Sequence, residues 1–388
     1  MKILKKIFFG ILILVILAIL GLLVTGNSHI LNGITKTWMI GKSKPDIDDK
    51  KYFDLREIKN GIPQPWKKSS NYNRISLSEK ILTDAETYGT VAFLVIHNDE
   101  IISEKYWEGY NETSSFNSFS MAKSYLGTLI GIAIDEGKIK GVDQKVSDYL
   151  TWFEEGELNQ KLTIKDLLTM SSGIDYGESY TNPFGFQAKA YYGHDLRNLV
   201  KNYSVKTSPG TVWKYEGGNS VLLGMILEKA TGESISNYFS EKIWSKIGAS
   251  QSAYWNLDDE GGMEKTFSAI YSNAQDFARM GKLYLNNGRW DEKQLVSELF
   301  VNQSIKPINI NDSKGENVKH YGYHYWLGEY QGKKFFHSRG MRGQYVIVIP
   351  EDNIIIVRLG HDRPKTRKNN LSTDTYDFID EAYRLIQE

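Results

Sequence analysis

A serine and a lysine three residues apart, Ser120 and Lys123, open an apolar run and supply the parts of an acyl-transfer nucleophile. Residues at this spacing lie on one face of a helix, so the two side chains can reach each other. A serine hydroxyl is a weak nucleophile until a neighbour accepts its proton, and a lysine does so when its surroundings lower its pKa from about 10.4. The same spacing also suits a capping serine beside a solvated lysine, and the motif alone leaves both interpretations open.

The residues after this pair predict the helix that positions it. Residues 124–134 are nearly all apolar and are followed by Asp135-Glu136-Gly137, which is typical of a buried helix with a glycine stop. Ser120 would then lie at the helix N-terminus, where free N–H groups and the helix dipole favour developing negative charge.

Three further segments accompany the motif, at residues 163–174 (TIKDLLTMSSGI), 213–224 (WKYEGGNSVLLG) and 336–344 (FHSRGMRGQ). In order, spacing and flanking sequence, the four elements resemble the β-lactamase-related serine hydrolases. That superfamily contains class C β-lactamases, DD-peptidases, family VIII esterases and 6-aminohexanoate-dimer hydrolases. The resemblance covers roughly residues 71–388.

The resemblance implies a role for each matching position. Ser120 matches the acylated serine and Lys123 the helix-borne base, while Tyr215 matches the tyrosine that relays protons to and from the leaving group. Gly340-Met341 matches a strand-edge turn, whose Met341 backbone N–H joins that of Ser120 in an oxyanion hole.

Two departures from the family pattern argue against β-lactam hydrolysis. The Tyr-x-Asn motif has Gly217 in place of the asparagine, and residues 338–340 read Ser-Arg-Gly in place of Lys-Thr-Gly. A substrate carboxylate therefore needs another cation, for which Arg339, Arg342 and His337 are the candidates.

The amide-hydrolase branch of the family fits better. Its Leu-Leu-x-Met segment is followed at a similar distance by a substrate-facing tyrosine, which here corresponds to Tyr180. Tyr176, Tyr191 and Tyr192 lie nearby, and for these three substrate contact and packing under a loop are equal alternatives.

Two histidines, His324 and His337, lie in strand-like segments close to the Ser-Arg-Gly motif at residues 338–340. A buried structural histidine is the commoner outcome at such positions. His337 precedes Ser338 directly, and it is kept as a candidate for lining the cleft together with Arg339 and Gly340.

Other site chemistries lack their ligand sets. The seven histidines are scattered without an H-E-x-x-H motif, and there is no cysteine. The phosphate-binding motifs G-x-x-x-x-G-K-[ST] and, on a strand, G-x-G-x-x-G are both absent from the sequence. We therefore expect no metal and no nucleotide cofactor. The 47 basic and 47 acidic residues balance, which gives no electrostatic footprint for nucleic acid.

The N-terminus predicts a membrane anchor over residues 1–26. The apolar run of residues 7–25 is long enough to cross a bilayer, and the lysines before it place the N-terminus in the cytoplasm and the rest of the chain outside. A cleaved signal peptide is the alternative, with residues 24–26 as the cleavage site. Residues 27–70, rich in Lys, Asp, Gly and Pro, are expected to form a tether with short ordered pieces.

The remaining patterns predict an α+β fold for residues 71–388. An antiparallel sheet assembled from N- and C-terminal parts would be flanked by terminal helices, with a mostly helical subdomain inserted at roughly residues 126–264 and the motifs in a cleft between them. The expected sheet and terminal-helix elements are a helix at 77–88, hairpins at 91–96/101–106 and 345–349/354–359, and a helix at 373–386.

These observations together predict a membrane-anchored, extracytoplasmic serine hydrolase that cleaves a small amide, ester or short peptide through an acyl-enzyme on Ser120. A peptidoglycan-directed DD-peptidase or a β-lactamase is the enzymatic alternative. A non-catalytic sensor on the same fold is a further alternative, against which the presence of Ser120, Lys123 and Tyr215 argues. The sequence indicates no oligomeric state.

Overall fold

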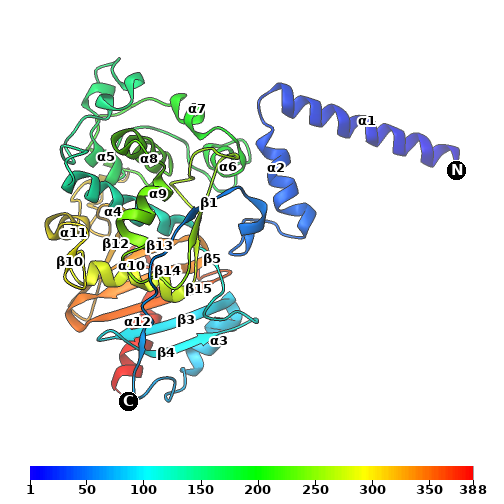
Figure 1. Cartoon of the computed structure of the whole chain (residues 1–388). Helices are drawn as coiled ribbons and strands as arrows, with labels where there is room; N and C mark the ends of the chain where they lie inside the picture. The colour runs from blue at the N-terminus through cyan, green and yellow to red at the C-terminus, as the bar shows by residue number, and fades with distance from the viewer. Residues whose placement is uncertain (388) are drawn as a thin grey trace.

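The computed structural model describes residues 1–387 and is centred on a seven-stranded sheet built from N- and C-terminal parts of the chain (Figure 1). The strands lie in the order β12-β13-β14-β15-β3-β4-β2. Neighbours are antiparallel except for the β2–β4 pair. The strand bounds are β2 (Lys67–Lys68), β3 (Thr90–His97), β4 (Glu100–Tyr106), β12 (Trp326–Tyr330), β13 (Lys333–Gly340), β14 (Gln344–Ile349) and β15 (Ile354–Gly360).

Two tight turns join strands of this sheet where the sequence predicts hairpins. Asn98 and Asp99, between β3 and β4, have φ values of 50° and 65°, the left-handed conformation that two-residue hairpin turns require. The second hairpin joins β14 to β15, and β15 in turn pairs with β3. This pairing confirms the predicted assembly of the sheet from the two ends of the fold.

Helices cover both faces of the sheet, and the alternation of strand side chains explains how. Ile347 of β14 packs in one apolar cluster with Ile379 of α12 (Asp374–Gln387) and Ile81 of α3 (Glu79–Tyr88). Val346, its neighbour, belongs to a second cluster with residues of α10 (Ala274–Leu285). Successive residues of a strand point to opposite faces, so apolar residues along β14 give the sheet two buried faces.

A mostly helical region packs beyond α10, at the top of the view in Figure 1. Its centre is α4 (Ala122–Asp135), buried from Ala122 to Ala133 and packed against α8 (Gly218–Thr231). Other helices of the chain are α5 (Ile164–Leu168), α6 (Phe186–Tyr192), α7 (Leu196–Lys201), α9 (Ile235–Phe239) and α11 (Glu298–Ser304). Gly131 permits the close packing of α4, because a Cβ there would lie 2.4 Å from the Phe300 ring.

Smaller sheets brace this region. Four strands lie in the order β1-β7-β8-β5, and three two-stranded pairs join β6 to β11, β9 to β10 and β16 to β17. Their bounds are β1 (Leu55–Ile58), β5 (Phe116–Asn117), β6 (Val212–Trp213), β7 (Ala253–Asn256), β8 (Ile270–Ser272), β9 (Arg289–Trp290), β10 (Lys293–Gln294), β11 (Asn311–Asp312), β16 (Arg367–Lys368) and β17 (Leu371–Ser372).

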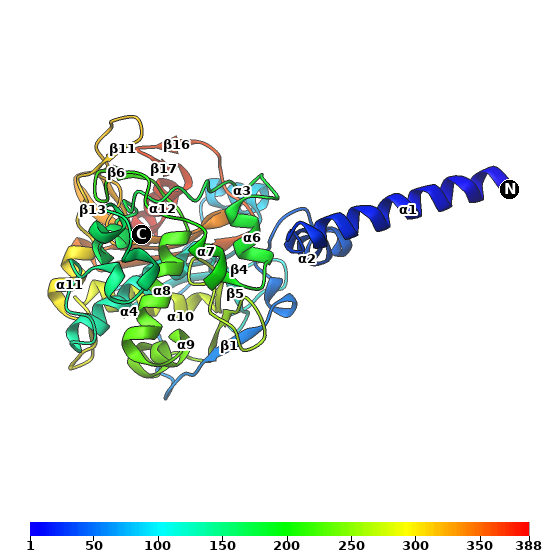
Figure 2. The same ribbon diagram turned by 90° about the horizontal axis from the view of Figure 1, so that it is seen from above.

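The N-terminal helix α1 (Lys2–Val24) projects away from the rest of the protein, as Figures 1 and 2 both show. It is apolar, and by length and composition it could cross a membrane or serve as a signal sequence. The next helix, α2 (His29–Lys36), runs across the end of α1 and packs against α6.

Residues 27–70 differ from the expected tether, because they form part of the folded body. β1 adds an edge strand to the four-stranded sheet, and the Ile47 carbonyl accepts a hydrogen bond of 2.9 Å from the Asn117 N–H. Asp46 contacts Arg342 at 3.3 Å and His361 at 2.9 Å. This segment is polar and lacks a sustained apolar period, so its sequence gives no sign of these long-range contacts.

Candidate active site

Ser120 lies in a short 3₁₀ turn, η3 (Phe119–Met121), directly before α4. The turn is fixed by β8: Ser118 donates its N–H to the Ile270 carbonyl at 2.7 Å, and its hydroxyl accepts the Ile270 N–H at 2.9 Å. Phe119 has a φ of 46°, an uncommon value for a residue with a side chain. Strained residues of this kind persist where the surroundings over-determine them, as these hydrogen bonds do.

Lys123 is buried next to Ser120, with only 2% of its surface exposed. Its Nζ lies 3.2 Å from the Ser120 Oγ and donates a second hydrogen bond to the Phe267 carbonyl at 2.5 Å. Within residues 1–387 it has no carboxylate partner. The Ser–Lys distance is within the range over which a base takes the proton of a nucleophile. The solvated-lysine interpretation of the motif is therefore wrong in this structure.

Tyr215 faces the same lysine. The Lys123 Nζ lies 5.2 Å from the centroid of its ring, which packs against Trp326 at 5.4 Å and Tyr321 at 6.1 Å. Tyr215 follows β6 and precedes α8, so two elements fix its backbone. In the described part of the chain its hydroxyl makes no hydrogen bond to Ser120 or Lys123. The structure thus brings the three predicted catalytic residues together.

The end of β13 brings Gly340 and Met341 beside the Ser120 turn. A Cβ on Gly340 would lie 2.1 Å from the Ser118 carbonyl oxygen, so only glycine permits this approach. Met341 follows and lines the same cavity as Ser120. Backbone N–H groups converging near a nucleophile stabilise the oxyanion of an acyl-transfer intermediate, which is the role expected for the Ser120 and Met341 amides.

Arg339 is buried and stacks on Trp326, with its guanidinium carbon 3.4 Å from the ring centroid. Its Nη1 is buried and has no hydrogen-bond partner, and no carboxylate within residues 1–387 pairs with it. Burial and the neighbouring Arg363 lower the pKa of Arg339 to about 10. A buried cation without a partner is costly, so its position beside Tyr215 indicates a place for an anionic group.

Two more buried donors without partners lie in the same aromatic group. They are the Trp213 Nε1 and the Tyr321 hydroxyl. The rings of Trp213 and Tyr321 lie 5.6 Å apart, and each packs against Trp326. Donors with no internal acceptor beside Arg339 add to the case for an anion here, because nearly all buried polar groups in proteins are paired.

His337 does not contribute to the cleft, which corrects the expectation from its place beside Ser338. It is fully buried, between Phe335 and Tyr345. Burial lowers the pKa of His337 well below its usual value. Phe335 and Tyr345 enclose His337, so its proximity to the motif in sequence does not bring it to Ser120.

His324 is buried as well, and it has a structural contact with the site. Its Nδ1 lies 3.0 Å from the Lys123 carbonyl, and its own carbonyl accepts a hydrogen bond from the Ser124 hydroxyl at 2.6 Å. Burial lowers the pKa of His324 to about 3, so the ring is neutral at physiological pH. It acts as a packing histidine that holds the first turn of α4.

A cavity of about 580 Å³ contains Ser120. Three parts of the chain line it: the catalytic turn with Ser268 and Met341, the loop and helix of residues 179–192, and residues 29–45, which we call the N-terminal wall. Tyr180 lies on this cavity, 60% exposed, and its hydroxyl donates to Glu178 at 2.7 Å. A ligand in the cavity could therefore contact the Tyr180 side chain, as predicted for a tyrosine that faces the substrate.

The other nearby tyrosines divide between lining and packing. Tyr191 and Tyr192 line the cavity, whereas Tyr176 is buried against Phe186 and Tyr203. None of the sequence motifs predicts the N-terminal wall. The apolar spacing of Ile30, Ile34 and Trp38 was the available signal.

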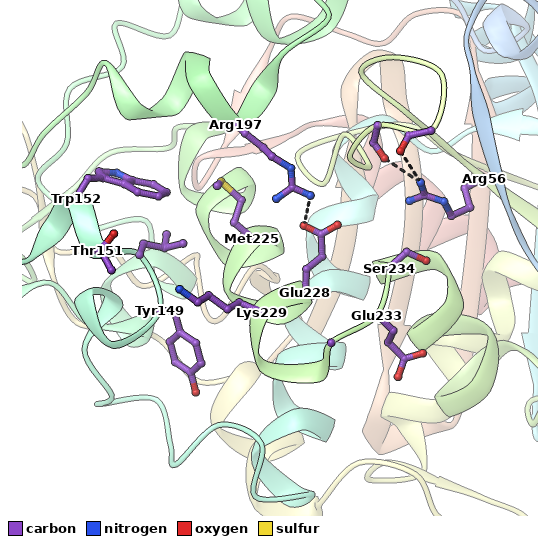
Figure 3. Close-up of a pocket in the computed structure, with 14 residues that line it drawn as sticks. Arg56, Tyr149, Thr151, Trp152, Arg197, Met225, Glu228, Lys229, Glu233 and Ser234 are labelled. Atoms are coloured by element: carbon purple, nitrogen blue, oxygen red, sulfur yellow. Dashed lines mark hydrogen bonds and ion pairs between the residues drawn. The ribbon is translucent and has the colours of Figure 1, made fainter.

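A second cavity, of about 590 Å³, is lined by residues of β1, α7 and α8 among others and contains none of Ser120, Lys123 and Tyr215 (Figure 3). Both arginines that line it have partners within the protein. Arg197 contacts Glu228 at 2.7 Å, and Arg56 donates to the Gly262 carbonyl at 2.9 Å. Among the described residues no cluster of metal-ligating side chains is found. The cavity with Ser120 is the candidate active site, because it alone of the two contains the serine of the Ser–Lys pair.

Comparison with known proteins agrees with this geometry. A family model described as Beta-lactamase matches residues 79–375. The chain belongs to the beta-lactamase family. The serine hydrolases related to β-lactamases include amide hydrolases, esterases and peptidases, and the Ser–Lys–Tyr arrangement described above lies within the matched region.

Individual relatives are distant. The 6-aminohexanoate-dimer hydrolase of Paenarthrobacter ureafaciens is 28% identical over 226 residues, which cover 55% of this chain and 56% of that protein. An uncharacterized protein of Alkalihalophilus pseudofirmus is 23% identical over 330 residues, 75% of this chain and 89% of that protein. A solved candidate 6-aminohexanoate-dimer hydrolase from Bacillus anthracis has a TM-score of 0.73 at 22% identity, covering 87% of this chain and 91% of the other. At that identity the structure shows a shared fold.

Proposed function

We propose that this protein is a serine hydrolase that cleaves an amide or an ester through an acyl-enzyme on Ser120. The observation that carries the proposal is the buried Lys123, whose Nζ lies 3.2 Å from the Ser120 Oγ with no carboxylate partner in the described chain. A binding protein has no need of a buried amine that lies at a hydroxyl without a carboxylate partner. Family membership supports the reaction class, while the individual substrate is not determined by it.

The proposed reaction follows from the positions of the groups. The Ser120 Oγ attacks the carbonyl carbon while Lys123, with Tyr215 next to it, takes the hydroxyl proton. The Ser120 and Met341 amides stabilise the oxyanion, and Tyr215 returns the proton to the departing oxygen or nitrogen. Water then attacks the acyl-enzyme, with the same groups acting in reverse, and releases the acid.

We propose further that the substrate carries an anionic group on the side of Tyr215. Arg339, with the unpaired Trp213 and Tyr321 donors beside it, supports this choice. A stacked guanidinium suits a carboxylate or a phosphate, both of which accept its planar N–H groups. A DD-peptidase or β-lactamase is the second candidate, because its substrates carry such a carboxylate.

We also propose that α1 anchors the protein in a membrane, with the remaining chain on the extracytoplasmic side. The exposed apolar surface of α1 and the lysines at its start support this arrangement. A cleaved signal sequence would give the same extracytoplasmic location without the anchor.

Covalent labelling with a fluorophosphonate probe tests the nucleophile. The wild-type protein should be labelled, and Ser120→Ala should not. The substitution removes one oxygen, so the free energy of unfolding should change by less than about 1 kcal/mol. Labelling that persists in folded Ser120→Ala protein would refute the assignment. A panel of p-nitrophenyl esters, nitrocefin and short D- and L-peptides then separates the esterase, β-lactamase and peptidase activities.

A further inference from the structure

The N-terminal wall places the Ser120 cavity next to α1. α2 contributes Ile30, Gly33 and Ile34 to the cavity lining, and residues 25–28 are all that separate it from the end of α1. Five residue steps span at most about 17 Å when fully extended. If α1 crosses a bilayer, this wall of the cavity lies within the headgroup region or directly above it.

Hydrogen bonds fix α2 in this position. His29 Nε2 lies 2.8 Å from the Pro183 carbonyl, and Asn32 donates its side-chain amide to the Tyr192 carbonyl at 3.1 Å. Both partners belong to the loop and helix that line the opposite side of the cavity. The wall is therefore part of the binding site and not a loosely attached neighbour of it.

Exposed apolar side chains surround this side of the cavity. Trp38 and Met39 are 72% and 74% exposed, and Ile34 is 39% exposed. On the opposite side, Tyr180 and Phe184 are 60% and 54% exposed. We call these five residues the apolar rim. Tryptophan and tyrosine favour the membrane–water interface, because their rings bury apolar area while a polar atom stays wet.

The orientation of the helices agrees with a membrane at this rim. α1 points away from the body in both views, and α2 runs across its end, between α1 and α6 (Figures 1 and 2). If α1 crosses a bilayer, a helix that runs across its end lies along the membrane surface, which is the position of α2. Lys42 pairs with Asp46 at 3.1 Å and Lys44 with Asp362 at 3.2 Å, so the apolar side chains of this segment, not its charges, carry the argument for a membrane.

We propose that the Ser120 cavity receives the hydrocarbon acyl chain of an amphiphile from the membrane surface. The proposal rests on the serine-hydrolase function and on the anchor proposed above, and it adds the substrate class: a long-chain acyl ester or amide. The chain enters over the apolar rim. Ser120 then forms an ester to the acyl carbon, the original C–O or C–N bond breaks with proton transfer to the leaving group, and water releases the fatty acid.

The acyl side of the substrate is assigned from the lining of the cavity. Ser120 and Met341 line it, whereas Tyr215 and Arg339, among the residues that the structure describes, do not. Because Tyr215 serves the leaving group, the part of the substrate in the cavity is the acyl part. A polar, anionic leaving group would lie on the other side of the scissile bond, by Arg339.

A chain-length series on the full-length protein in phosphatidylcholine–phosphatidylglycerol vesicles tests the proposal. kcat/KM for p-nitrophenyl esters should rise at least tenfold from the acetyl to the decanoyl ester, because each buried methylene adds binding energy. The double variant Ile34→Asp/Trp38→Asp should flatten this rise. Leu299→Asp is the matched control and should keep it, because Leu299 of α11, on the far side of the body, is 70% exposed, close to the 72% of Trp38. A flat wild-type series, or an unchanged rise in the double variant, would overturn the proposal.

A second measurement works without turnover and separates the two proposals. Ser120→Ala protein in the same vesicles is exposed to a decanoyl ester that carries a photoactivatable group at the end of its chain. We expect crosslinks in residues 29–45 and 179–192. These crosslinks should be lost when Ile34→Asp/Trp38→Asp is added to Ser120→Ala. Crosslinks confined to α1 would refute the acyl-chain site. Failure of fluorophosphonate labelling with these crosslinks intact would refute the hydrolase function alone.

Discussion

At the scale of single residues, the molecule combines a buried base with a buried, unpaired cation. Lys123 and Arg339 are both removed from solvent, and neither has a carboxylate partner in the part of the chain described. Burying a charge without a partner costs free energy of folding, so the unpaired guanidinium of Arg339 supports the anionic group proposed for the substrate. Tyr215 connects the two groups, because its ring contacts both Lys123 and Trp326, and Arg339 stacks on Trp326.

Tyr215→Phe separates proton transfer from packing. The substitution keeps the ring against Trp326 and Tyr321, so the free energy of unfolding should barely change. Turnover should fall by about 10² to 10⁴, the usual contribution of general acid–base catalysis. The loss should be larger for an amide than for a p-nitrophenyl ester, because an amide nitrogen must be protonated before it departs. Equal turnover of an amide by both proteins would reduce Tyr215 to a packing residue.

Arg339→Leu tests the anionic group. KM for a substrate with a carboxylate next to the leaving group should rise by about 10- to 100-fold, as for a lost charged hydrogen bond, while the neutral analogue shows a much smaller change. Arg339→Lys should restore binding only in part, since an ammonium lacks the planar donors. Arg339→Leu should unfold at no lower urea concentration than wild type, because it removes an unpaired buried charge. Equal rises in KM for both substrates would show that Arg339 only supports the fold.

At the scale of elements, the catalytic helix, the hairpins and the terminal helices could be predicted, because each has a local signal. The apolar run of α4, the Asn98-Asp99 turn and the spacing of α12 all follow from nearest neighbours in the chain. The enclosure of His337 away from the cleft could not be predicted in this way. His337 and Arg339 lie on the same face of β13, and only the tertiary packing separates them: Phe335 and Tyr345 enclose His337, whereas Arg339 stacks on Trp326 next to Tyr215.

Lys265 shows an element-scale contact that no motif predicts. It is buried where residues 27–70 meet α6: its Nζ donates to the Tyr191 carbonyl at 2.8 Å and lies 4.5 Å from the centroid of the Phe53 ring. Burial, followed by repulsion from Lys36, lowers the pKa of Lys265 from 10.5 to about 7. The folded protein therefore releases this proton at a lower pH than the unfolded chain does.

The sign of the resulting pH dependence is fixed by that difference. Between about pH 7 and 10.5 the unfolded chain holds a proton that the folded protein has released, so this residue makes the free energy of unfolding rise with pH by up to about 1.4 kcal/mol per unit. Below pH 7 both states are protonated and the burial penalty is constant. Lys265→Met should remove this rise. Urea unfolding of both proteins at pH 7, 8, 9 and 10 measures it, and parallel curves would contradict the assignment.

At the scale of the whole molecule, the sheet and the inserted helical region are those of the family, and the sequence predicted both. The contacts of residues 46 and 47 were not predictable, because polar segments fold onto a domain through contacts with residues far away in sequence. Ile47 meets Asn117, and Asp46 meets Arg342 and His361. Such contacts leave no periodic pattern in the segment itself.

Deletion of residues 1–26 tests the anchor. The full-length protein should fractionate with membranes, and the deleted protein should be soluble and labelled by a fluorophosphonate at Ser120, since the N-terminal wall begins at residue 29. Membrane fractionation and N-terminal sequencing of the mature protein are the measurements. A mature N-terminus at Asn27 would show that α1 is a cleaved signal sequence. Full-length protein in the soluble fraction would show that α1 does not anchor the protein.

The match to the family begins at residue 79, whereas one wall of the Ser120 cavity comes from residues 29–45. A recombinant fragment cut at the family boundary would keep every catalytic residue and lose that wall together with edge strand β1. Any substrate profile measured on it would then describe a wider, more open cavity than that of the full chain. The same holds for homologues. Two proteins with equal catalytic motifs can differ in the segment before the matched region and so present different cavity walls to a substrate. Their selectivity then diverges through a part of the chain that a comparison of motifs leaves out.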